Sequence, residues 1–125
     1  IGERVIEVSE DFEQSELRNP TSGFVAYVPR GSLKSGEKLV RTGGDGRFIA
    51  CTVCHGQNLK GQYLKGMGNV PPIAGRSPSQ IARQLIDYRT GTRHGANSAP
   101  MRLLARKLTN ADIVAITGYL ASLNP

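Results

Sequence analysis

Five consecutive residues, Cys51-Thr52-Val53-Cys54-His55, carry the strongest chemical signal in this chain of 125 residues. They include both of its cysteines and one of its two histidines. The spacing C-x-x-C-H suits a porphyrin, because one helical turn points both thiols at the two vinyl groups while the next imidazole reaches the iron. The segment therefore predicts one covalently bound haem c, attached through Cys51 and Cys54, with His55 as an axial ligand.

Two other interpretations of the paired cysteines are weaker. A disulfide or a thioredoxin-like dithiol needs no histidine after the second cysteine, and usually sits in a βαβ setting that this sequence does not show. A structural zinc site needs four ligands, and only His94 remains beyond the C-x-x-C-H segment. Haem attachment is therefore favoured.

Length and composition agree with a small haem domain. The chain has the size of one domain, and its 38% of hydrophobic residues is modest for a self-sufficient core. A porphyrin is a large apolar body that would supplement such a core. The sequence shows no apolar run of membrane-spanning length and no signal-peptide pattern, and it begins at Ile1, so we expect a processed product or a part of a longer protein.

Charge is unevenly distributed along the chain, whose net charge is +6. Residues 1–16 hold six acidic residues and one basic residue, whereas residues 17–125 hold fifteen basic and four acidic residues. The cationic body favours an acidic docking partner through long-range attraction. Its basic residues are spread singly, without a Lys/Arg block, so nucleic acid is not an expected partner.

The chain divides into an arm and a body. Residues 1–31 show little helical periodicity and several turn signals, which predicts an extended N-terminal arm or inter-domain linker. Residues 32–125 are the predicted haem domain. Its first helix is expected to begin at an N-cap, Ser32, and to end at Gly43-Gly44.

Three more helices are expected after the C-x-x-C-H segment. Residues 56–70 are rich in glycine and are predicted to be mobile or tightly turned. A helix then runs from the N-cap Ser77, in a capping box with Gln80, to Gly91. A short helix over residues 100–107 and a last helix that begins at Thr109 complete the pattern.

A close helix crossing is predicted at Gly36. This glycine lies on the apolar face of the first helix, where it costs about 1 kcal/mol relative to alanine. A residue of small size is usually needed where another helix crosses closely. Tyr119, on the last helix, is the predicted contact.

Four segments in order carry a family resemblance: C-T-V-C-H-G at 51–56, P-P-I-A-G-R-S-P at 71–78, R-Q-L-I-D-Y-R-T-G-T-R at 83–93 and P-M-R-L-L-A-R-K-L-T-N-A-D-I-V-A-I-T-G-Y-L-A-S-L at 100–123. Over residues 32–125 the chain resembles a class I cytochrome c, in particular the C-terminal haem domain of bacterial dihaem cytochromes c. The resemblance implies an all-α fold with about four to five short helices around one covalently bound haem. Residues 1–11 and 22–32 are similar to the segment that joins the two haem domains in such proteins, so a preceding haem domain of the same polypeptide or a single-haem relative is implied.

The second axial ligand has three candidates, Met67, Met101 and His94. Met67 lies only twelve residues after His55, in the glycine-rich segment, and is interpreted as a packing residue. Met101 lies 46 residues after His55, which is enough chain to reach the opposite face of a haem. The family resemblance implies Met101, because class I cytochromes c place their sulfur ligand in a P-M pair before a short helix. His94 is interpreted as a surface histidine, with bis-histidine ligation as the alternative.

Further contacts follow from the resemblance. An iron-bound His55 should donate its other ring N–H to a carbonyl. The resemblance implies that this acceptor is the carbonyl group of Pro71. Arg76 and Tyr88 are candidates for contacts with the haem propionates, with alternative roles on the surface and in the helix core, respectively.

These ligands predict a function. With histidine and methionine both bound, the iron has no open position for a substrate, so the domain is expected to cycle between Fe(III) and Fe(II) as an electron carrier and not as an enzyme. Its partners are expected to be redox proteins with an acidic docking surface. The basic residues expected around the haem edge are Lys60, Lys65, Arg93, Arg102 or Arg106.

Two other functions remain as alternatives. A five-coordinate haem enzyme or gas sensor would need a weak or absent Met101 bond and a distal residue, for which only His94 is available. An electron-relay or docking subunit of a larger oxidoreductase is the second. The resemblance also implies a periplasmic protein, or one at the periplasmic face of the membrane, with no transmembrane segment in this chain.

Overall fold

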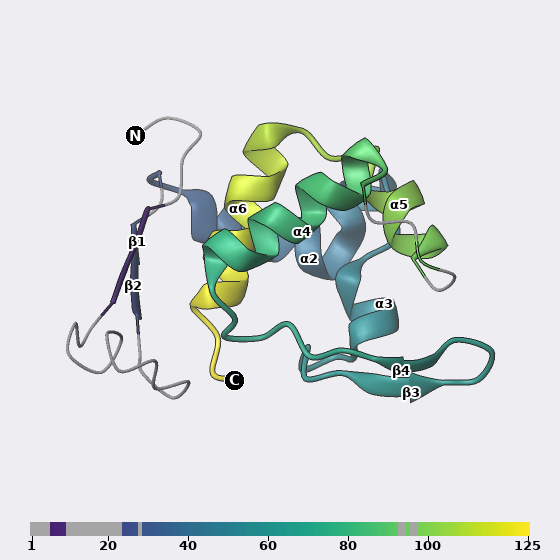
Figure 1. The fold of residues 1–125 in the computed structure, drawn as a ribbon. Helices are drawn as coiled ribbons and strands as arrows, with labels where there is room; N and C mark the ends of the chain where they lie inside the picture. Colours follow the sequence, from purple (N-terminus) through teal and green to yellow (C-terminus); the bar gives the residue numbers. More distant parts are fainter. Residues whose placement is uncertain (1–5, 10–23, 28, 93–94, 96–97) are drawn as a thin grey trace.

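The computed structural model describes residues 6–9, 24–27, 29–92, 95 and 98–125. Within these ranges the chain is mostly helical, with two small antiparallel sheets (Figure 1). The helices are α2 (Ser32–Gly46), α3 (Cys51–His55), α4 (Pro78–Thr90), α5 (Ala99–Ala105) and α6 (Asn110–Ala121). The strands are β1 (Ile6–Ser9), β2 (Phe24–Tyr27), β3 (Gln62–Leu64) and β4 (Gly68–Val70).

The described part of the N-terminal arm is a two-stranded sheet. Strand β1 pairs antiparallel with β2, with Ile6 opposite Tyr27 and Ser9 opposite Phe24. The pair lies at one end of the helical body, beside α4 and α6 (Figure 1). The backbone of both strands is extended as expected, but they pair with each other. Residues 1–5, 10–23 and 28, which include five of the six acidic residues of residues 1–16, lie outside the described residues.

Helix α2 begins one residue earlier than expected. Its N-cap is Gly31, in a left-handed conformation at φ 85°, and the predicted N-cap Ser32 is the first helical residue. The prediction was wrong because it relied on the preference of serine for N-cap positions. Here the turn into the helix needs a positive φ, which glycine adopts readily. The predicted end is confirmed, because the backbone turns left-handed at Gly43. A Cβ there would overlap the carbonyl oxygen of Phe48.

Helices α2 and α6 cross at Gly36, as predicted. A Cβ on Gly36 would overlap the carbonyl oxygen of Ala115 and lie 2.6 Å from Cβ of Tyr119. The Tyr119 hydroxyl accepts a hydrogen bond from Nε of Arg41, on α2, at 2.9 Å. The two helices therefore touch backbone to backbone, which only glycine permits at this position.

The other helix ends follow the predicted caps. Ser77 Oγ accepts from the backbone N–H of Gln80 at 3.3 Å, and Gly91 ends α4 with φ 83°. Helix α5 covers residues 99–105, close to the predicted 100–107. At the start of α6, Thr109 and Asp112 exchange two hydrogen bonds of 3.0 and 2.9 Å in a full capping box.

The glycine-rich segment is tightly turned, which is one of the two predicted alternatives. It contains the β3–β4 hairpin, with Gln62 opposite Val70 and Leu64 opposite Gly68. Leu59, which is fully buried, anchors its base, and its carbonyl accepts from the N–H groups of Ile73 and Ala74. Three-residue strands are too short for an alternating pattern to reveal them, so the glycines dominated the prediction.

The core lies between α2, α4 and α6. Its most deeply buried large side chains come from α2, the segment after α3, and α6: Val40, Leu59, Ile116 and Leu120. From α6, Ile113, Ile116 and Leu120 are buried in this core, and Leu123 packs against the same cluster.

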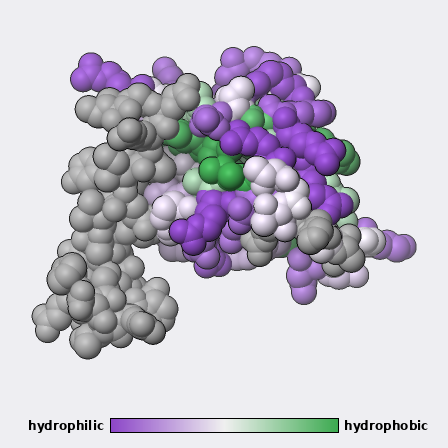
Figure 2. Space-filling model, turned by 45° about the horizontal axis from the view of Figure 1, so that its top comes forward, coloured by the Kyte–Doolittle hydropathy of each residue, from purple (hydrophilic) through white to green (hydrophobic). Residues whose placement is uncertain are grey.

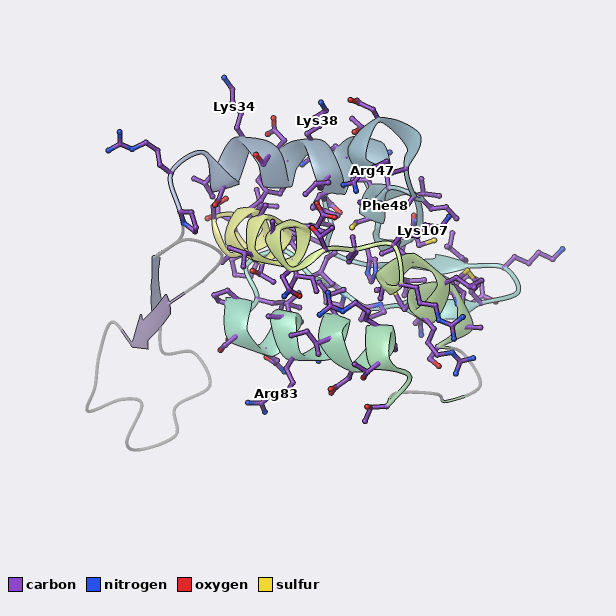
Figure 3. The ribbon with its side chains drawn as sticks, turned by 90° about the horizontal axis from the view of Figure 1, so that it is seen from above. Lys34, Lys38, Arg47, Phe48, Arg83 and Lys107 are labelled. Atoms are coloured by element: carbon purple, nitrogen blue, oxygen red, sulfur yellow. The ribbon has the colours of Figure 1, made fainter. Side chains whose placement is uncertain are left out.

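A charged contact ties the end of α2 to the start of α6. Arg47, which lies beside Phe48 in Figure 3, places Nη2 3.1 Å from Oδ1 of Asp112. Burial of the Asp112 carboxyl raises its pKa, but hydrogen bonds from the backbone N–H of Thr109 and from Arg47 more than offset this, so its pKa is lowered. The carboxylate therefore stabilises the fold above its unfolded-state pKa, and this contribution is lost as pH falls through the folded-state pKa.

We expect Asp112→Ala to lower the free energy of unfolding at pH 7 by about 1 kcal/mol, because a cap and an ion pair are lost together. Urea unfolding of the haem-loaded protein between pH 7 and pH 3 measures this. The gap between parent and variant should close towards low pH. A gap that is constant with pH would contradict the assignment.

Candidate haem site

A cavity of about 840 Å³ opens between the α3 segment, the β3–β4 hairpin and helices α4, α5 and α6. Much of its wall is aliphatic, with Ile81 and Leu85 from α4, Leu104 from α5, and Ile116 and Leu120 from α6. A smaller cavity of about 310 Å³ lies between the starts of α2 and α6, and no cysteine, methionine or histidine lines it. The large cavity is therefore where the chemistry of this chain gathers.

Helix α3 carries the C-x-x-C-H segment along the cavity. It follows Ala50, which is extended, and ends at Gly56, whose φ of 94° turns the chain away after little more than one turn. Cys51, Cys54 and His55 all line the cavity. A single short helix thus presents both thiols and the imidazole to the same space, as the spacing predicted.

The imidazole of His55 is fixed by the predicted contact. Its Nδ1 lies 2.7 Å from the carbonyl oxygen of Pro71, and since a carbonyl can only accept, Nδ1 donates. Burial lowers the pKa of His55, and the bond to Pro71 offsets this only in part. The ring is therefore neutral at neutral pH, and Nε2 keeps the lone pair that a metal requires.

The remaining predicted residues divide into three groups. Met101, at the start of α5, and Tyr88, near the end of α4, both line the cavity with His55. Arg76 is exposed and is not among the lining residues, so its contact with a propionate stays a prediction. His94 and Arg93 lie outside the described residues.

Met67 lies in the turn of the β3–β4 hairpin, where it is 37% exposed, and it borders the cavity. Its interpretation as a packing residue stays a prediction.

The competing interpretations of the cysteines lose support. Burial raises the pKa of the Cys51 thiol to about 11. A backbone hydrogen bond lowers this pKa in part, and the neighbouring Cys54 raises it by a smaller amount. A redox-active dithiol needs a lowered thiol pKa instead. Within the described ranges, no three His, Cys, Asp or Glu side chains cluster as a metal site would require.

The cavity fits a haem on two physical grounds. Its volume lies in the upper part of the range of about 300–1,000 Å³ for protein ligand sites, as a large cofactor requires. Every buried side-chain nitrogen and oxygen among the described residues already has a hydrogen-bond partner, so the cavity does not demand a polar occupant. Figure 2 shows a hydrophobic area within a mostly hydrophilic surface on one face of the helical body.

Two residues that position the site were not singled out from the sequence. Gly61 and Gln62 both donate hydrogen bonds to carbonyl groups of α3. Gly61 was visible only as one of several loop glycines, and no sequence signal marked Gln62.

A helical fold around an apolar cavity, with a C-x-x-C-H helix and a methionine from another helix on its walls, defines a c-type haem domain. Comparison with known proteins gives the family: the model described as Cytochrome c matches residues 34–124, and the chain belongs to the cytochrome c family. The predicted class I cytochrome c fold is confirmed. The domain is accordingly an electron-transfer domain with covalently bound haem c.

Individual relatives agree with this assignment. Cytochrome c4 of Stutzerimonas stutzeri is 38% identical over 104 residues, which cover 82% of this chain and 48% of that protein. The thiosulfate dehydrogenase electron acceptor of Thiomonas intermedia (strain K12) is 32% identical over 104 residues, covering 81% of this chain and 46% of that protein. The crystal structure of reduced recombinant cytochrome c4 from Pseudomonas stutzeri matches with a TM-score of 0.68 and 33% identity, over 91% of this chain and 67% of that one.

The chain spans about half the length of the curated relatives it matches. No helix among the described residues is both long enough and apolar enough to cross a membrane.

Proposed function

We propose that this chain carries single electrons between redox partner proteins through one haem c, with His55 and Met101 as its two axial ligands. The observation that supports this most is that His55, held by Pro71 through Nδ1, and Met101 line the same apolar cavity. Histidine and methionine are the ligand pair of electron-transfer cytochromes c. This chain has no catalytic residue in the proposal, and works as a carrier and not as an enzyme.

The residues of the chain set the properties of the bound group. When bound, haem c supplies an iron that takes up and gives back one electron. Cys51 and Cys54 would hold it by thioether bonds. His55 would supply nitrogen and Met101 sulfur, which would favour the ferrous state relative to two histidines. The aliphatic wall from α4, α5 and α6 excludes water and favours the less charged state in the same direction.

Carbon monoxide tests the proposed coordination. We expect the reduced, haem-loaded protein to bind carbon monoxide slowly and incompletely at neutral pH, because Met101 occupies the position that the gas needs. Absorption spectra recorded before and after addition of the gas measure this. Fast, complete binding would instead indicate a five-coordinate iron, and with it a haem enzyme or gas sensor.

Relatives suggest the kind of partner. Two matched proteins are named as electron acceptors of thiosulfate dehydrogenase. By analogy, this chain would accept electrons from a dehydrogenase and pass them to a second redox protein. Because the chain covers about half the length of these relatives, we also propose that a haem domain precedes it in the same polypeptide, with residues 1–31 as the arm or linker and residues 32–125 as the second domain.

The proposed docking surface is basic and lies near the haem site. Lys60 and Lys65 are exposed on the segment that follows α3, and Arg106 is exposed at the end of α5, with Arg102 half-buried on that helix. An acidic partner would be attracted to this side of the domain. A periplasmic location is proposed with it, because haem c is attached outside the bacterial cytoplasm in this family.

We expect the double change Lys60→Glu and Lys65→Glu to slow electron transfer with an acidic partner by about tenfold at low ionic strength, and much less at high salt. Stopped-flow kinetics over a salt series measure the effect. The matched control is the double change Lys34→Glu and Arg83→Glu, because these two side chains project from α2 and α4 away from the helical body (Figure 3). Equal slowing by both pairs of changes would contradict a local docking surface, because the net charge of the protein alone would then explain the effect.

A further inference from the structure

The end of the C-x-x-C-H helix is held by two consecutive residues from the hairpin that follows it. Helix α3 has five residues, so its last carbonyl groups find no partner within the helix. Nε2 of Gln62 donates to the carbonyl oxygens of Val53 and Cys54, each at 3.1 Å. The backbone N–H of Gly61 donates to the carbonyl of His55 at 2.9 Å. Three consecutive carbonyls of the haem-binding helix are thereby satisfied.

The same hairpin carries the group that orients the His55 ring. Gln62 on β3 lies opposite Val70 on β4, and Pro71 follows Val70 directly. The Pro71 carbonyl accepts from Nδ1 of His55 at 2.7 Å. The backbone of His55 and the acceptor of its ring are therefore fixed relative to each other through the base of one hairpin.

Gly61 makes this arrangement possible. It has φ of 87°, in the left-handed region where side chains are strained. A Cβ at this position would lie 2.7 Å from the carbonyl oxygen of Val70 and 3.0 Å from the nitrogen of Pro72. The strand that carries Pro71 thus passes directly against the Gly61 backbone, and any side chain would displace it.

We propose that Gln62 and Gly61 are positioning residues for His55, and that through the His55–Pro71 hydrogen bond they help to set the reduction potential of the haem. This inference deepens the proposed function and rests on it. A ring N–H held firmly by a carbonyl makes the imidazole a stronger donor, which favours the ferric state. If the hairpin base loosens, that bond weakens and the potential rises.

The test compares two glutamines in the haem-loaded protein. Gln62→Leu removes the two donated hydrogen bonds at similar side-chain volume, and Gln57→Leu makes the same change at an exposed position in the same segment. We expect Gln62→Leu to shift the reduction potential upward and to speed solvent exchange of the His55 Nδ1–H, seen by NMR of the reduced protein, about tenfold. Gln57→Leu should change neither. Gly61→Ala should shift the potential in the same direction and further.

Two results would overturn the proposal. If Gln62→Leu lowers stability to urea but leaves the potential and the ring N–H exchange at parental values, Gln62 is only a structural cap. If Gln57→Leu produces the same shift in potential, the effect is not specific to the hydrogen bonds that Gln62 donates to α3. Failure of the proposed function is separate, because it would appear in the parent protein as missing haem or as rapid carbon monoxide binding.

Discussion

Replacing Met101 by alanine is expected to leave the haem attached and to open one axial position. Cys51, Cys54 and His55 are untouched, so the mass of the protein should still include one haem, as the proposal of a single group requires. The weak red-end absorption band of sulfur bound to ferric iron should disappear. The reduced variant should bind carbon monoxide rapidly, and its potential should fall by on the order of 0.1 V, since axial ligands set haem potentials over about 0.8 V.

The second methionine of the cavity provides the matched control. Met67 borders the same cavity from the hairpin turn, so Met67→Ala removes the same atoms from another side of it. We expect that change to leave the band, the gas binding and the potential close to parental values. If Met67→Ala abolished the band and Met101→Ala preserved it, the axial assignment would be reversed. If the parent protein showed no such band, the ligand would not be sulfur, and His94 would be the remaining candidate.

Gly36→Ala is expected to cost about 3 kcal/mol of the free energy of unfolding. On helix propensity alone this change should gain about 1 kcal/mol, so the sign of the effect tests the packing directly. The added Cβ would overlap the backbone of Ala115 and crowd Cβ of Tyr119, and two packed backbones cannot separate without opening the core. Urea unfolding of the haem-loaded protein, followed by circular dichroism, measures the difference.

The control for this prediction sits next to it. Ser35 is exposed on α2, and Ser35→Ala should be neutral or slightly stabilising. A stabilised Gly36→Ala variant would mean that α2 and α6 can move apart at little cost. In that case the close crossing would not be a determinant of the fold.

Much of the fold was predictable because several signals are local and chemically specific. Capping patterns of only four residues predict the helices that follow Ser77 and Thr109, and both caps form. The close crossing at Gly36 was predictable because glycine destabilises a helix, so a glycine on its apolar face indicates that a small residue is required there. The C-x-x-C-H spacing and Pro71 were likewise readable, and the structure brings both to one cavity.

The features that could not be predicted from the sequence depend on contacts between segments. The β3–β4 hairpin has strands of three residues, and its stability comes from Leu59 and from backbone pairing, neither of which produces a periodic pattern. The role of Gln62 depends on its meeting α3 across a turn. Gly31 replaced Ser32 as a cap because the entry into α2 requires a positive φ, which residue preference alone does not reveal.

The walls of the cavity come from residues between Ile49 and Leu120, and helices α3, α4, α5 and α6, the turn of the hairpin and strand β4 all contribute to them. None of these wall-forming elements could be removed without opening the cavity. Loss of any one wall would admit water to the metal and change the visible colour. The red absorption expected of the haem-loaded protein can therefore serve as an optical gauge of how α3, α4, α5, α6 and the β3–β4 hairpin pack around the haem.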